Sequence, residues 1–199
     1  MIISGTIRVA CPACALEADV PITQSINARE KPELKARLLT GDFNLLACER
    51  CGKRTQLETS LSFHDPDREY FCVATPGNDA LGEAALGEVG NIGTRRLVPS
   101  KNALVEKVKI LDADLDDRVV EVLKVLLLAS RGDDINSVLL FERADDTTLT
   151  WLLLDDKQIL SSPRSAYAKL ASTLKPSDDL RIDRAWAVEA ARAMMASAN

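Results

Sequence analysis

The sequence predicts an α+β fold: a metal-stapled β region, then helices, then a C-terminal β-hairpin with further helices. Three observations carry this prediction. Two Cys-x-x-Cys pairs lie among short strand-like segments in residues 1–75, apolar residues recur at helical spacing through residues 100–131, and two alternating segments follow at 138–154. With 46% apolar and 28% charged residues, the chain of 199 residues has an ordinary globular composition.

Charge and cysteine content argue against several classes of protein. The net charge of −5 disfavours sequence-independent nucleic-acid binding, which needs a basic surface. No apolar run approaches the roughly 18 residues of a membrane-spanning helix. Residues 1–8 show no charged stretch followed by an apolar one, so we expect no export signal and a cytoplasmic protein. Five cysteines, an odd number, disfavour a disulfide framework.

Four of the five cysteines form two close pairs: Cys11 with Cys14, and Cys48 with Cys51. Two intervening residues let one tight turn aim both sulfurs at a point about 2.3 Å away, and two such turns complete a tetrahedral zinc site. Pro12 fixes φ in the first turn, and Gly52 permits a positive φ after the last ligand. The sequence therefore predicts a structural Zn²⁺ held by four thiolates. The alternative is a thiol redox protein that uses both pairs.

Residues 1–75 are predicted to form a zinc-ribbon-like domain. The expected strands lie at residues 6–10, 15–22, 43–47, 55–63 and 70–74. The 33 residues between the two cysteine pairs exceed the roughly 15–20 of a simple ribbon. We place a helical insertion at residues 27–40, where Pro32 lies near the helix start and Gly41 follows its end.

Residues 76–99 are predicted to form a Gly-rich linker or loop, with room for a short helix around residues 80–86, because they hold five of the nine glycines. Within this segment, we expect residues 76–96 to be the most mobile internal part of the chain. An α+β domain at residues 100–199 then follows. Its first helix is expected to have Ser100 as its N-cap.

The helix expected at residues 115–130 is strongly apolar. Between residues 118 and 128 only Arg118, Glu121 and Lys124 interrupt its valines and leucines, so its apolar surface covers more than one face. We expect it to be central to a core, between the ribbon and the C-terminal unit. Part of its surface, or of the Ala-rich final helix, is expected to face a second subunit in a homodimer or another protein partner.

The boundaries of the C-terminal elements are set by turn and capping residues. Asp114 is the expected cap of the helix at 115–130, and Gly132 its end. The expected hairpin strands lie at residues 138–143 and 149–154, and a helix is expected after Pro163. Asp183 is expected to cap the last helix.

His64 and Asp65 are the remaining candidates for a functional role. An enzyme site between the two domains would use His64 and nearby carboxylates, and it remains an alternative. A His-Asp-Pro sequence more often closes a strand and starts a turn, and four thiolates leave no metal position for His64. Cys72 lies in an apolar strand-like run and is expected to be buried. Because no arrangement typical of catalysis occurs, the sequence favours a non-enzymatic protein.

Three segments resemble the bacterial CpXC family: Cys11-Pro12-Ala13-Cys14, residues 34–44 with their Gly-Asp-Phe-Asn ending, and Cys48-Glu49-Arg50-Cys51. Residues 63–66 and 115–124 are also similar to segments of that family, so the resemblance covers roughly residues 8–130. Glu49 stands where the family usually has Pro, which changes the rigidity of the turn but not the ligands. The resemblance implies a four-cysteine zinc site. It implies no reaction, because the family has no assigned activity.

Together these observations favour a zinc-binding, non-enzymatic interaction or regulatory module. Its expected partner is a protein or a second copy of the chain, rather than nucleic acid or a membrane. The alternatives are an enzyme that uses His64, and a thiol redox protein.

Overall fold

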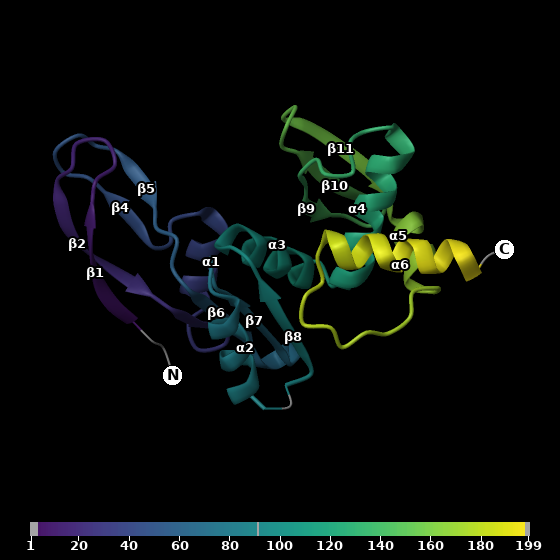
Figure 1. The fold of residues 1–199 in the computed structure, drawn as a ribbon, viewed down its shortest axis with the longest axis horizontal. Coiled ribbons are helices and arrows are strands. Elements are labelled where there is room, and N and C mark those ends of the chain that lie inside the picture. The colour runs from purple at the N-terminus through teal and green to yellow at the C-terminus, as the bar shows by residue number, and fades with distance from the viewer. Residues whose placement is uncertain (1–3, 91, 198–199) are drawn as a thin grey trace. The chain divides into compact units, whose positions relative to one another are not determined.

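The computed structural model describes residues 4–90 and 92–197. The chain divides into two compact units, Met1–Val105 and Glu106–Asn199. Both units contain helices and strands, which confirms the α+β prediction (Figure 1). In the described part of the chain, no helix combines the length and the apolar character needed to cross a bilayer.

The first unit contains two β-hairpins that share a small apolar core (Figure 1). One hairpin pairs β1 (Ser4–Ala10) with β2 (Glu17–Thr23), and the other pairs β4 (Leu45–Ala47) with β5 (Arg54–Gln56). The buried residues of their common core are Cys11, Val20, Ile22, Leu46, Cys48 and Leu57. Strands as short as β4 and β5 form only a marginal hairpin by themselves, so this hairpin depends on its contacts with the rest of the unit.

A four-stranded mixed sheet completes the first unit. Its strand order is β3-β6-β7-β8, with β3 (Ser25–Asn27) parallel to β6 (Leu61–Asp65). Strand β7 (Tyr70–Ala74) is antiparallel to β6 and parallel to β8 (Thr94–Val98). The helix α1 (Pro32–Thr40) has Pro at its first turn and ends at Gly41 with φ +79°, as the sequence predicts.

The single strand predicted at residues 55–63 is wrong, because the structure divides it between two sheets. The first part is β5 in the second hairpin, and the last part lies in β6 of the four-stranded sheet. Leu57 is buried in the hairpin core, whereas Leu61 and Phe63 are buried in β6. The alternating pattern is therefore real, but it crosses from one sheet to the other.

Within residues 76–99, the structure confirms the short helix expected around residues 80–86 and adds a strand that the sequence did not predict. The structure places α2 (Asp79–Glu88) and β8 there, and the Asn78 side chain caps α2 by accepting a hydrogen bond from the Leu81 N–H at 3.1 Å. Gly82 is buried, and a Cβ at this position would lie 2.8 Å from Thr75 Oγ1 and in contact with Leu97. This glycine therefore permits close packing of α2 and does not mark a flexible chain.

In the second unit, an antiparallel sheet of order β11-β10-β9 packs against helices. The predicted hairpin is confirmed as β9 (Leu139–Ala144) and β10 (Thr148–Leu153). Strand β11 (Gln158–Pro163) was missed, because its first residues are exposed and alternate poorly. Trp151 on β10 is fully buried and donates to Ser162 Oγ on β11 at 3.0 Å.

The helices of the chain's second half begin and end close to the predicted positions: α3 (Lys101–Asp112), α4 (Asp117–Arg131), α5 (Arg164–Ala171) and α6 (Arg184–Ser197). Ser100 caps α3, Asp183 caps α6, and Gly132 ends α4 with φ +75°, as predicted. The prediction that Asp114 caps α4 is wrong. Asp116 is the cap, and its carboxylate accepts from the Arg118 N–H at 2.9 Å.

Helix α4 is central to the core of the second unit. On one side, Val120, Leu123 and Leu128 share a core with the sheet residues Phe141 and Trp151. On another side, its Val122 and Val125 pack with Ala187 and Ala191 of α6. The expectation of apolar packing on more than one face is therefore confirmed, whereas contact with a second subunit stays a prediction.

Five charged side chains lie buried where α3 and α4 meet: Glu106 and Lys107 on α3, and Asp117, Glu121 and Lys124 on α4. Lys107 Nζ lies 2.9 Å from an Asp117 oxygen and 3.2 Å from a Glu121 oxygen. Lys124 Nζ lies 2.7 Å from Glu106 and 3.1 Å from the same Glu121 oxygen. Glu121 is thus the shared acceptor of both ammonium groups.

Opposite charges dominate the electrostatics of this buried cluster. Burial acts to lower the pKa of Lys107, but the carboxylates of Glu121 and Asp117 more than compensate and raise it above its usual value. Burial likewise acts to raise the pKa of Glu121, and Lys107 and Lys124 together hold it below its usual 4.5. Removing Glu121 would therefore leave two buried cations short of a partner.

We predict that Gly82→Ala lowers the free energy of unfolding of the first unit by about 1–3 kcal/mol, because Leu97 and Thr75 are buried and cannot move aside freely. Gly87→Ala is the matched control in the same helix. No atom lies within 4 Å of its added Cβ, so this variant should gain about 0.5–1 kcal/mol. Thermal unfolding and hydrogen exchange in β7 and β8 measure both. Equal effects of the two changes would contradict the packing role.

We predict that Glu121→Gln lowers the free energy of unfolding of the second unit by about 3–5 kcal/mol, the cost typical of breaking a buried ion pair. Glu189→Gln, which breaks the exposed pair with Arg192, should have little effect. Both tryptophans, Trp151 and Trp186, lie in this unit, so urea unfolding followed by tryptophan fluorescence measures its stability.

The same variant tests the pH dependence. Because the folded pKa of Glu121 lies below 4.5, its contribution is complete above that pH and is lost as the pH falls through the folded value. The parent protein should therefore lose stability on acidification below about pH 4.5, and Glu121→Gln should lose less over the same interval. Parallel acid curves for the two proteins would show that Glu121 is not responsible.

Candidate metal centre

The two cysteine pairs lie in matching turns, one between β1 and β2 and one between β4 and β5. In the first turn, the Ala15 N–H donates to Cys11 O at 2.9 Å, and in the second the Gly52 N–H donates to Cys48 O at 2.9 Å. In each turn the N–H of the first cysteine also donates to the carbonyl oxygen five residues later, at 2.8 and 2.9 Å. The same pair of hydrogen bonds therefore closes both turns.

Both turns reverse the chain through a left-handed residue placed directly after the second cysteine. Gly52 has φ +69°, as the sequence predicts, and Ala15 has φ +57°. The role of Ala15 was missed, because alanine is not a residue that signals positive φ. The equal spacing from Cys11 to Ala15 and from Cys48 to Gly52 is the signal that identifies it.

The four sulfurs converge on one point. Cys11 Sγ lies 3.6 Å from Cys51 Sγ, and Cys14 Sγ lies 3.5 Å from Cys48 Sγ, so each short distance joins the two turns. All four sulfurs lie within 4.8 Å of one another. A tetrahedron with metal–sulfur bonds of about 2.3 Å has edges of about 3.8 Å. The sulfur geometry therefore fits a metal ion of this kind.

The turns favour ionised thiols at two positions. The backbone N–H of Cys51, and then that of Arg50, point at Cys48 Sγ and lower the pKa of this thiol to about 6. The N–H groups of Ala13 and Cys14 similarly lower the pKa of Cys11. Backbone donors thus favour a thiolate at the first cysteine of each pair.

Cys14 shows what a bound cation would contribute to the group. The Leu16 N–H acts to lower its pKa, but burial and the neighbouring Cys48, Cys51 and Cys11 outweigh it and raise the pKa to about 11. Four thiolates this close together repel one another. A bound divalent cation removes that repulsion, so the donor set fits a soft-ligand metal.

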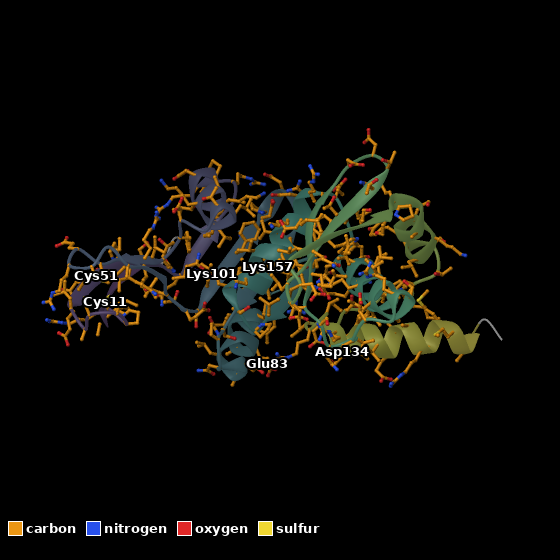
Figure 2. All side chains as sticks on the ribbon, turned by 90° about the horizontal axis from the view of Figure 1, so that it is seen from above. Cys11, Cys51, Glu83, Lys101, Asp134 and Lys157 are labelled. Atoms are coloured by element: carbon orange, nitrogen blue, oxygen red, sulfur yellow. The ribbon has the colours of Figure 1, made fainter. Side chains whose placement is uncertain are left out.

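The site is buried on one side and exposed on the other. Cys11 and Cys48 are part of the hairpin core, at 2% and 5% exposure, whereas Cys51 is exposed. Figure 2 shows Cys11 and Cys51 close together at the end of the hairpins. A metal ion held tetrahedrally by these four sulfur atoms would have no open ligand position.

The structure gives His64 and Asp65 other contacts. His64 lies on β6 with its ring centroid 5.8 Å from that of Phe71 on β7. Asp65 is buried, accepts from the Asp67 N–H at 3.2 Å and pairs with Arg68 at 3.1 Å. In the part of the chain that the structure describes, the group able to hold a metal consists of the four cysteines and does not include His64.

Cys72 also lies outside the cluster, fully buried on β7, which confirms the prediction that it is buried.

Comparisons with known proteins identify the family. Comparison with curated proteins and with solved structures gave no match. Residues 9–124 match the family model described as CpXC protein, a match that spans more than half of the chain and includes all four clustered cysteines. The chain therefore belongs to the CpXC family.

Proposed function

We propose that this chain is a zinc-binding, non-enzymatic interaction module in which one Zn²⁺ ties the two hairpins together. The proposed ligands are Cys11, Cys14, Cys48 and Cys51. The observation that carries the proposal is the convergence of four sulfurs from two turns, all within 4.8 Å of one another. Thiolates select soft or borderline metals, and Zn²⁺ takes four of them in tetrahedral geometry.

The proposed metal is structural. Its binding would add to the small core that the two hairpins share, where two of the six buried residues are themselves ligands. A Zn²⁺ with four thiolates carries two net negative charges and has no open position, so it acts as a cross-link rather than as a Lewis acid. A reducing cytoplasm would keep the thiols available, and we place the protein there.

We predict that the purified protein contains about one zinc per chain, measured by elemental analysis. Cys48→Ser should bring this value close to zero after dialysis against a chelator, because three thiolates hold the ion less tightly. Two controls should keep about one zinc: Cys72→Ala, which removes the cysteine outside the cluster, and His64→Gln. Loss of zinc in His64→Gln would mean that the ligand set is wrong.

A different result would favour the redox alternative. If the protein contains no metal and instead forms two reversible disulfides, the cysteine pairs carry redox chemistry and the zinc proposal fails.

We predict that zinc removal loosens the hairpins and leaves the second unit intact. Hydrogen exchange should become faster in β1, β2, β4 and β5, because their common core loses its metal cross-link. The urea midpoint measured by tryptophan fluorescence should not change, because both tryptophans lie in the second unit. Unchanged exchange in the hairpins after complete zinc removal would show that the metal is not structural.

A further inference from the structure

The second unit contains an apolar groove of about 1260 Å³, lined by α4, α5, α6 and the segment between α5 and α6. Both α5 and α6 pack against α4 (Figure 1). Its apolar lining includes Leu126, Leu127, Leu170, Trp186, Ala190 and Met194. On each helix the lining residues recur at spacings of three and four, so each presents one stripe to the same space.

The apolar side chains that line the groove are only partly covered by other residues of this unit. The apolar side chains just named are partly buried and pack at the margin of the two cores that flank α4. Trp186 is held in place by a hydrogen bond from its Nε1 to Asp179 Oδ2 at 2.8 Å. The groove therefore combines apolar surface that can still be buried with at least one fixed aromatic wall.

The acidic and the basic side chains that line the groove differ in their interaction partners. Of its two acidic residues, Asp179 accepts from Trp186 and from Ser177 Oγ, and Glu189 pairs with Arg192 at 2.8 Å. Lys169 and Lys175 also line the groove, and within residues 4–90 and 92–197 neither ammonium group has an ion pair. With Glu189 paired to Arg192, the two ammonium groups outnumber the carboxylate of Asp179, so the groove offers a partner a net positive charge.

We propose that this groove binds an acidic amphipathic helix of a protein partner. The apolar stripes of α4, α5 and α6 surround one space that a fourth helix can occupy. The apolar side chains of such a helix would pack into the grooves between the side chains of the three stripes. The volume exceeds the about 300–1,000 Å³ of most small-molecule pockets. Acidic residues beside the apolar face of the partner helix would pair with Lys169 and Lys175.

A second copy of the chain fits this groove less well. A two-fold contact would set the same surface against itself, and with it two positive edges, which repel. The proposal rests on the interaction role proposed above and names the class of partner, but it does not depend on the zinc. Zinc content is therefore measured on the same samples, so that failure of either proposal is seen separately.

The probe is a synthetic, fluorescently labelled helical peptide of about 15 residues, with leucines at spacings of three and four and glutamates beside them. The control peptide has lysine in place of each glutamate. In fluorescence anisotropy, the acidic peptide should bind at least about tenfold more tightly than the basic one, and rising salt should reduce the difference.

Exposed lysines provide matched variants. Lys169→Glu and Lys175→Glu should each weaken binding of the acidic peptide about three- to tenfold and should strengthen binding of the basic one. Lys157→Glu makes the same charge change between β10 and β11, outside the groove lining, and should have no effect (Figure 2). These side chains are exposed, so the fold should tolerate all three changes.

A second pair of variants tests the apolar surface. Ala193→Trp places a large side chain at an exposed position in the groove and should abolish peptide binding, whereas Ala185→Trp on the same helix, outside the lining, should not. Equal binding of both peptides, or of neither, overturns the proposal. So does a concentration-dependent dimer that Ala193→Trp dissociates, since that result assigns the groove to a second copy of this chain.

Discussion

The mutual repulsion of four thiolates brought to one point is the main electrostatic constraint on the two hairpins of the first unit. The chain places them there by repeating one turn twice, with the same hydrogen bonds and a left-handed residue at the same position. Backbone N–H groups lower the pKa of Cys11 and Cys48 and so stabilise a thiolate at each. The pKa of Cys14 is raised, so the backbone donors do not compensate a negative charge at that sulfur. A cation bound at this point would therefore stabilise the folded hairpins directly.

The second unit also buries several charged groups close together, and there the opposite charges come from the chain itself. Three carboxylates and two ammonium groups lie buried where α3 and α4 meet, and each ammonium group contacts two carboxylates. In the cysteine cluster every ionisable group is negative when ionised, so a counter-charge would have to come from a cation in solution. In the charged cluster of the second unit the counter-charges are encoded in α3 and α4, so this unit can form its polar core without a ligand.

Local signals in the sequence were sufficient for much of the fold. The cysteine spacing identified the candidate ligands, and the caps Ser100 and Asp183 located helix starts. The errors came from features that depend on distant packing. Gly82 was counted among flexible glycines because nothing local shows that Thr75 and Leu97 lie against it. Glu121 and Lys124 were seen only as interruptions of an apolar helix, although their i, i+3 spacing was the signal of an ion pair.

The bond from Lys107 Nζ to Ile182 O, at 2.8 Å, has a consequence for recognition. Ile182 directly precedes Asp183, the cap of α6, so the buried cluster fixes where one wall of the groove begins. A wall anchored from inside the core keeps its position before any helix arrives. A helix that bound there would not have to order this wall, because the wall is already ordered when the chain folds, and the entropic cost of binding would be smaller by that amount.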